Sequence, residues 1–196
     1  MIGILLAAGF SRRFGDADKL LHVMEDGRSI AVASAQNLMS AVPLTIAVVR
    51  RENVELQQAL KALGVTVTLA EGEEEMADSL ALAIRFASSF DEAETGFVIA
   101  LADMPFIQPI TIQAIGMALM RGASIVVPTY TAPDTGDVRR GHPVAFSARF
   151  TQPLQTQQGD MGAKRILQRH QDDITFLPCE DPGILVDIDR LADIPQ

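Results

Sequence analysis

The sequence predicts an α/β fold: a single three-layer α/β/α domain with a mostly parallel, Rossmann-like sheet and an antiparallel late strand. Short apolar runs alternate with helical apolar spacing over the first 127 residues, and the connections between them suit one sheet. This alternation favours parallel strands with helices on both faces. The chain has 196 residues, of which 48% are hydrophobic, enough for one core without disulfide or metal support.

The first elements are predicted in order by apolar runs and capping residues. Residues 2–7 form a strand, and Ser29 can cap a helix with apolar positions through residue 41. Residues 44–49 form the second strand. Asn53 can cap the next helix, whose apolar positions recur at i, i+3, i+4 and i+7 until Gly64 ends it. A third strand over residues 65–69 and a helix over residues 80–87 continue the pattern.

The alternation of strands and helices continues to residue 127, and beyond that residue the elements are predicted less regularly. Residues 97–101 predict a fourth strand, residues 112–119 a helix and residues 124–127 a fifth strand. Residues 128–141 are rich in turn residues and predict a loop. A short strand at 143–146 suits an antiparallel neighbour, a helix is expected near 163–170, and residues 174–177 and 184–188 predict edge or late strands. No repeat or long linker divides the chain, so one domain spanning residues 1–196 is expected.

Composition excludes several classes of protein. The formal net charge is −9, which is the wrong sign for a general binder of nucleic acid or of a membrane surface. The one cysteine, Cys179, excludes a disulfide framework and a multi-cysteine metal site. The N-terminus lacks the basic region of a signal peptide. The uncharged stretch of residues 29–49 contains Ser34, Asn37 and Pro43, which favour a helix, a turn and a strand over a membrane span. We therefore expect a cytoplasmic protein.

The loop after the first strand carries the strongest functional signal. Ligands of open α/β sheets bind beyond the carboxyl ends of the strands. Small residues from Ala7 to Gly9 let the backbone approach a ligand, and Arg12, Arg13 and Lys19 add three cations that can hold phosphate. Neither G-x-x-x-x-G-K-[ST] nor G-x-G-x-x-G is present, which argues against a P-loop kinase and a nicotinamide oxidoreductase. The alternative is a solvated basic turn.

Several segments together resemble a known family. The loop reads Leu6-Ala7-Ala8-Gly9-x-Ser11-x-Arg13-x-Gly15, followed by Lys19, and further segments are Leu-Ala-Asp-Met-Pro at 101–105, Gly-His-Pro at 141–143, Gly-Asp-Met-Gly-Ala-Lys at 159–164 and Val-Asp-Ile-Asp at 186–189. This set resembles the MobA-like nucleotidyltransferases. It is similar above all to the branch of molybdenum cofactor cytidylyltransferases, because Ala7-Ala8-Gly9 replaces the Ala-Gly-Gly of the guanylyltransferase branch.

The resemblance implies a role for each matching residue. Residues 1–127 would be the nucleotide-binding half and residues 128–196 the acceptor-binding half. Arg13, Lys19 and Asp103 would be catalytic, and Mg²⁺ would be bound by Asp103 and Asp189, with Asp187 as a weaker second choice. His142 and Asp160 would contact the acceptor. The expected nucleotide-binding residues are Leu6, Ala7, Ala8, Gly9, Ser11, Arg13, Lys19, Ser79 and Asp103.

The residues themselves leave structural alternatives open. Asp103 two residues after an apolar run suits Mg²⁺, but an Asp before Met-Pro also starts a turn. Asp187 and Asp189 would share one face of an extended strand, and Asp187 can equally face solvent. Asp78 or Ser79 can cap a helix, as can Asp160, and His142 can be a structural turn residue.

The resemblance implies Mg²⁺-dependent transfer of CMP from CTP to a molybdopterin-type phosphorylated acceptor with release of pyrophosphate, and it leaves room for an apo-molybdoenzyme as a further partner. Two departures from the family pattern stand out: Arg190-Leu191 replaces Thr-Pro, and a Gly expected near Glu75 is missing. Alternatives are another phosphorylated acceptor, GTP as donor, or a cofactor-handling chaperone without catalysis.

Overall fold

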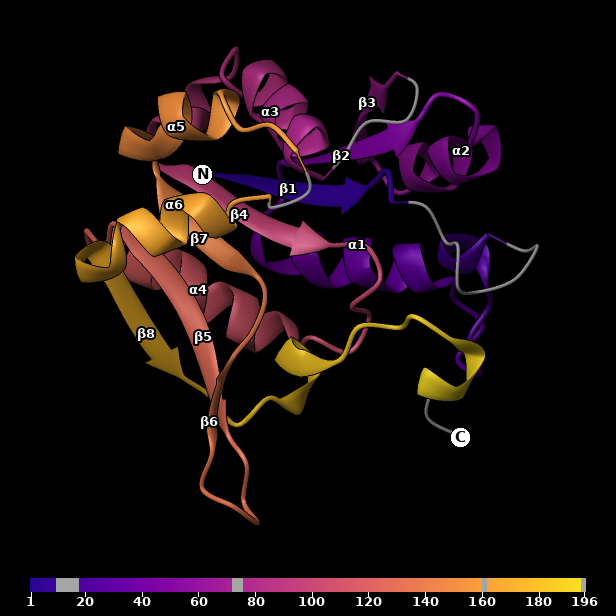
Figure 1. The fold of residues 1–196 in the computed structure, drawn as a ribbon. Helices are drawn as coiled ribbons and strands as arrows, with labels where there is room; N and C mark the ends of the chain where they lie inside the picture. Colours follow the sequence, from indigo (N-terminus) through magenta and orange to yellow (C-terminus); the bar gives the residue numbers. More distant parts are fainter. Residues whose placement is uncertain (10–17, 72–75, 160–161, 195–196) are drawn as a thin grey trace.

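A computed structural model describes residues 1–9, 18–71, 76–159 and 162–194 (Figure 1). The strands are β1 Ile2–Ala7, β2 Thr45–Arg50, β3 Thr66–Ala70, β4 Gly96–Leu101, β5 Ile125–Thr131, β6 Val138–Arg140, β7 Val144–Ser147 and β8 Ile174–Pro178. The helices are α1 Ile30–Ala41, α2 Val54–Ala62, α3 Met76–Ala87, α4 Pro109–Met120, α5 Thr151–Gln155 and α6 Lys164–Arg169. Short 3₁₀ turns include η1 Lys19–Leu21 and η5 Pro182–Leu185.

The eight strands form one mixed sheet. Its order is β3-β2-β1-β4-β7-β5-β6, with β8 on the other side of β5. Strands β1 to β4 pair in parallel, and β8 is parallel to β5. β7 runs antiparallel to both β4 and β5. The predicted mostly parallel sheet with an antiparallel late strand is confirmed, and β7 is that strand.

Helices cover both faces of the sheet and make the three predicted layers (Figure 1). Side chains of α1, α2 and α4 pack with Leu5 and Ala7 of β1 on one face. Side chains of α3, α5 and α6 pack with Ile2 and Ile4 on the other. Successive residues of a strand point to opposite faces, so one apolar strand serves two cores.

The predicted capping residues occupy the expected places. The Ser29 hydroxyl accepts a hydrogen bond from the Val32 amide at 3.4 Å and begins α1. The Asn53 side chain accepts from the Leu56 amide at 3.2 Å and begins α2. Gly64 follows α2 with a φ of 90°, the left-handed conformation that glycine adopts most easily. Local chemistry therefore sets these helix ends.

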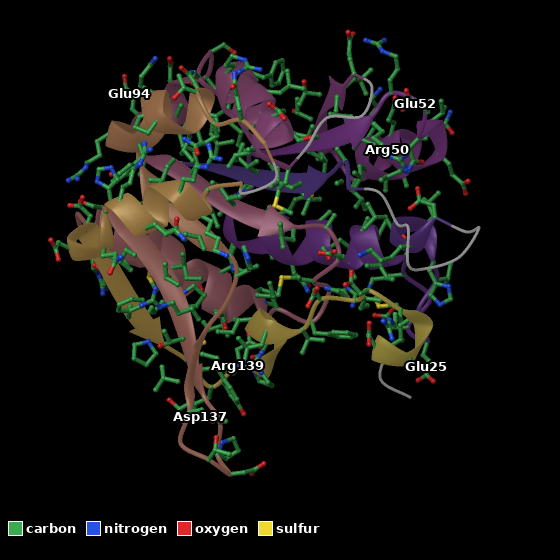
Figure 2. The ribbon with its side chains drawn as sticks, in the orientation of Figure 1. Glu25, Arg50, Glu52, Glu94, Asp137 and Arg139 are labelled. Carbon is green, nitrogen blue, oxygen red and sulfur yellow. The ribbon has the colours of Figure 1, made fainter. Side chains whose placement is uncertain are left out.

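Several predicted elements differ in the structure. α3 begins at Met76, so Asp78 lies in its first turn and Ser79 inside it, and neither residue is an N-cap. The expected loop at 128–141 contains the end of β5 and all of β6, which pair as a hairpin. This hairpin protrudes from the molecule, and Figure 2 shows its residues Asp137 and Arg139. Helix α5 was not predicted.

The expected strand at 184–188 is wrong. Pro182 lacks an amide hydrogen and sits at the start of η5, while the Asp181 carboxylate accepts a hydrogen bond from the Gly183 amide at 3.0 Å. The chain then leaves η5 without pairing in the sheet. Asp187 and Asp189 therefore do not share the face of a strand.

No helix in the described part of the chain is both long enough and apolar enough to span a membrane.

Candidate functional site

Strands β1 and β4 end side by side, and the turn after β4 carries Asp103. The two strands are paired in parallel, with Leu6 opposite Leu101. Just beyond the pair, the Ala102 amide donates to the Leu6 carbonyl oxygen at 3.0 Å. Asp103 therefore lies at the carboxyl edge of the sheet, next to the end of β1, which is where open α/β sheets bind ligands.

Two polar side chains of α1 hold the Asp103 turn in place by hydrogen bonds to its backbone. The Ser34 hydroxyl donates to the Ala102 carbonyl oxygen at 2.9 Å, and the Asn37 amide donates to the Pro105 carbonyl oxygen at 2.8 Å. Ser34 and Asn37 are three positions apart in the sequence and therefore lie on the same face of α1. They are positioning residues that the sequence reasoning missed, and two polar residues at helical spacing in an uncharged helix were the available signal.

Lys19 lies opposite this turn and reaches two carboxylates. Its Nζ atom donates to Asp103 Oδ2 at 2.8 Å and to Asp189 Oδ1 at 3.4 Å. The Lys19 side chain is 10% exposed, against 24% for Asp103 and 40% for Asp189. Lys19 and Asp103, which the resemblance assigns to one catalytic site, therefore lie in direct contact.

Asp189 reaches the site on the C-terminal segment. The Ile188 amide donates to the Asp103 carbonyl oxygen at 2.9 Å, so this segment is attached to the same turn. The Asp193 carboxylate accepts hydrogen bonds from the amides of Asp189 at 2.9 Å and Arg190 at 2.7 Å. In Figure 1 the yellow C-terminal segment lies on the side to which the arrowheads of β1 and β4 point.

A buried carboxylate anchors this segment further upstream. Asp181 is 2% exposed and accepts hydrogen bonds from the Gln108 amide at 2.8 Å and the Thr111 hydroxyl at 2.7 Å, both at the start of α4. A buried carboxylate needs hydrogen-bond donors of this kind to offset the loss of water. Asp181 thus joins the C-terminal segment to the helix that follows the Asp103 turn, a role that the sequence did not indicate.

Charge pairing dominates the electrostatics of the site. Burial acts to lower the pKa of Lys19, but its hydrogen bonds and ion pairs with Asp103 and Asp189 outweigh burial, and the pKa of Lys19 is raised. Lys19 is therefore an ammonium ion at neutral pH. Asp187, by contrast, is exposed and lies outside this hydrogen-bonded group.

The two carboxylates suit a hard divalent cation. Both reach one ammonium nitrogen, so one small cation can be shared between them. Among the described residues no group of three or more His, Cys, Asp or Glu side chains could hold a metal. Mg²⁺ typically takes one or two carboxylates and completes its shell with water and phosphate oxygens. The donor set therefore fits a metal that arrives with a phosphate ligand.

A pocket of about 420 Å³ lies on the α3 and α6 face of the sheet. Its walls are mostly apolar and come from β1, β4, β5, β7, α3 and α6. Three basic side chains line it as well: Arg140, His142 and Lys164. The Arg140 guanidinium lies 4.6 Å from the ring centre of Phe176, which supports it by a cation–π contact.

His142 is a half-buried polar residue that lines this pocket. Its Nδ1 atom is buried and has no hydrogen-bond partner among the described residues. Burial lowers the pKa of His142, and the charges of Asp103 and Asp187 oppose that lowering without reversing it. The imidazole is therefore neutral at neutral pH.

The remaining predicted residues divide into two groups. Ala7 and Ala8 are buried at the end of β1, Gly9 is exposed just after them, and Ser79 is 3% exposed inside α3. Ser11, Arg13 and Asp160 lie outside the described residues. The structure thus brings Lys19, Asp103 and Asp189 together and sets His142 in a neighbouring pocket.

A protein-family model described as the MobA-like NTP transferase domain matches residues 3–174. The chain belongs to this family. Because the family consists of NTP transferases, this MobA-like protein is a nucleotidyltransferase with a nucleoside triphosphate as substrate. No curated protein matches the sequence.

Solved structures with the same fold include Rv0371c of Mycobacterium tuberculosis H37Rv, with 25% identity, a TM-score of 0.79 and coverage of 98% of this chain and 95% of that one. A second crystal structure of Rv0371c is a complex with manganese, at a TM-score of 0.74 and 23% identity, covering 98% and 94%. A nucleotidyl transferase of Methanothermobacter has a TM-score of 0.76 at 20% identity and covers 98% and 93%. These matches confirm the three-layer fold of the MobA-like chain, and the manganese complex is consistent with divalent metal use in the family.

Proposed function

We propose that this MobA-like protein transfers CMP from CTP to a molybdopterin-type phosphorylated acceptor, with Mg²⁺ as cofactor and pyrophosphate as the second product. The observation that carries the proposal is the Lys19 ammonium between the carboxylates of Asp103 and Asp189, at the carboxyl ends of β1 and β4. A cation and two metal-type ligands at that edge suit a metal-bound triphosphate.

The first half of the chain, residues 1–127, is proposed to bind the nucleotide. Small residues at Ala7, Ala8 and Gly9 allow the triphosphate to approach the backbone. Lys19 and Arg13 would neutralise its charge and that of the departing pyrophosphate. Mg²⁺ bound by Asp103 and Asp189 would supply further charge neutralisation at the α-phosphate.

In this reaction the protein would mainly align the acceptor phosphate with the α-phosphorus of CTP and stabilise charge. A terminal phosphate oxygen of the acceptor would form a bond to the α-phosphorus of CTP, and the bond from that phosphorus to the bridging oxygen of pyrophosphate would break. The attacking phosphate is already an anion, so no strong general base is required. Holding the two reactants in line and stabilising the developing charge supply the rate acceleration.

The second half, residues 128–196, is proposed to bind the acceptor in the 420 Å³ pocket, to which it contributes Arg140, His142 and Lys164, while β1, β4 and α3 supply part of the apolar wall. Its apolar walls suit a flat ring system, and Arg140 and Lys164 suit an anionic phosphate. Neutral His142 lines the same pocket and is proposed as an acceptor contact. Asp160, in the segment that precedes α6, is proposed as a further acceptor contact.

Pyrophosphate release tests the proposal directly. The purified protein is incubated with Mg²⁺, CTP or GTP, and molybdopterin or another phosphorylated acceptor such as a sugar phosphate or methylerythritol phosphate. We expect release with CTP and molybdopterin, and we expect Asp103→Asn and Asp189→Asn to abolish it. Asp187→Asn is the matched control and should keep most of the activity. A preference for GTP or for another acceptor would overturn the assigned substrates, and full activity of Asp103→Asn would overturn the assigned site.

A further inference from the structure

Asp18, the residue before Lys19, forms two hydrogen bonds with different partners. One carboxylate oxygen, Oδ1, accepts from the Leu20 amide at 2.9 Å and caps the short turn η1. The other, Oδ2, accepts from the side-chain amide of Asn53. Asp18 therefore fixes the turn on which Lys19 stands, and Asn53 fixes Asp18.

Asn53 is itself held in place by strand β2. Its backbone amide donates to the Arg50 carbonyl oxygen at 3.1 Å, at the end of β2, and its side-chain oxygen caps α2. The side chain of Gln57 closes the same connection by donating to the carbonyl oxygens of Arg50 at 3.1 Å and Arg51 at 2.9 Å. The side chain of Asn53 thus has one oxygen committed to the helix and one amide committed to Asp18.

We propose that Asn53 is a positioning residue for Lys19. Its hydrogen bond to Asp18 attaches the turn η1, which carries Lys19, to the end of β2, and this attachment directs the ammonium group toward the triphosphate. This inference rests on the proposed function, because it assumes that Lys19 binds the nucleotide. Lysine has a long, flexible side chain, so the place of its Cα atom limits where the ammonium can go. A hydrogen bond to an ionised carboxylate is among the stronger ones available to fix that place.

Exchanging the two residues provides the test. In Asn53→Asp the cap of α2 remains, since Asp and Asn cap equally well, but two carboxylates then face each other. In Asp18→Asn the cap of η1 remains, but two amide groups then face each other. The double variant Asp18→Asn with Asn53→Asp restores one donor opposite one acceptor and keeps both caps. Asn53→Ser keeps a capping oxygen and lacks the amide donor.

The measurement is the dissociation constant for CTP with Mg²⁺, together with the thermal unfolding midpoint and separate KM and kcat values. Each single variant, Asn53→Ser included, should bind Mg–CTP about three- to tenfold more weakly, the factor typical of one lost hydrogen bond. KM for CTP should rise more than kcat falls, and the double variant, which keeps both caps and one donor opposite one acceptor, should unfold near the wild-type temperature. The double variant should recover most of the affinity.

Wild-type affinity in Asn53→Asp and Asn53→Ser would overturn the inference, as would a double variant no better than the single ones. Lys19→Ala separates this failure from failure of the proposed function. If Lys19→Ala loses Mg–CTP affinity while Asn53→Asp does not, Lys19 binds the nucleotide without help from Asn53. If Lys19→Ala binds Mg–CTP as tightly as the wild type, both the proposed site and the inference fall.

Discussion

The Lys19 ammonium lies between the carboxylates of Asp103 and Asp189, the two residues proposed to bind the metal. Its ammonium group balances two carboxylates that would otherwise repel each other in a partly buried site. In the proposed reaction, a metal bound to the same oxygens would take over that balance and leave Lys19 able to contact phosphate. Lys19 would then pair with the two carboxylates in the free protein and with phosphate in the nucleotide complex.

Removing Lys19 should make the fold depend on divalent cations. In Lys19→Ala the carboxylates of Asp103 and Asp189 lose their common counter-ion, so the thermal unfolding midpoint should fall at neutral pH. Adding Mg²⁺ or Mn²⁺ without nucleotide should raise that midpoint more than in the wild type, because the cation no longer competes with an ammonium. Lys61→Ala, on the outer part of α2, is the control. An equal metal effect in Lys19→Ala and wild type would contradict this expectation.

His142 should make the protein less stable in mild acid. Burial is the main cause of its lowered pKa, so below about pH 6.5 the unfolded chain binds a proton that the folded protein resists. Stability linked to His142 is therefore complete above pH 6.5 and is lost as the pH falls below it. Urea unfolding near pH 7.5 and near pH 5.5 should show a smaller loss for His142→Gln than for the wild type. Parallel losses in the two proteins would rule out this role of burial.

Elements with local signals were predictable, whereas those that depend on distant contacts were not. Ser29, Asn53 and Gly64 act on their own helix ends, and the structure confirms them. The C-terminal segment is apolar like a strand, yet hydrogen bonds to the start of α4 and to the turn after β4 hold it in place, and no sequence window contains these partners. In the same way, the sequence indicated Lys19, Asp103 and Asp189 as site residues but could not show that one ammonium touches both carboxylates.

Gly183 should be essential for placing the C-terminal segment. A Cβ atom there would lie 2.2 Å from the Phe106 carbonyl oxygen, which is backbone and cannot move aside easily. We expect Gly183→Ala to lower the free energy of unfolding by about 1–3 kcal/mol and to weaken Mg–CTP binding by displacing Asp189. The control is Gly122→Ala, which has a φ of 99° and no neighbour within 4 Å, so it should lose stability only through backbone strain. Denaturant unfolding and calorimetry check both, and unchanged nucleotide affinity in Gly183→Ala would refute the link.

Across the whole molecule, the charge needed for an anionic substrate is concentrated in one place. The net charge is −9, so the protein as a whole repels a triphosphate. In the proposed function, attraction would come from Lys19, from the basic residues of the first loop and from a bound metal. Because the site joins the ends of β1 and β4, turn η1 and the C-terminal segment, a ligand there should stabilise segments that are distant in sequence.

Hydrogen exchange should reveal this coupling. With saturating Mg–CTP, amide exchange should slow in peptides covering residues 18–24, 101–106 and 186–193 together, because ligand binding stabilises the native state by mass action. A ligand at 100 times its dissociation constant adds about 2.7 kcal/mol. Asp103→Asn should show no such protection under the same conditions. Slower exchange limited to one of these peptides would show that they do not form a common site.

Lys19 and Asp189 are 170 residues apart in sequence and 3.4 Å apart in space. During synthesis on the ribosome, strands β1 to β4 therefore emerge long before the second carboxylate exists. An unfinished chain, or one trimmed by a protease before residue 189, can retain most of the sheet and yet lacks one of the two acidic groups around the lysine. If Asp189 binds the metal as proposed, such fragments would lack nucleotidyltransferase activity even where their sheet has formed.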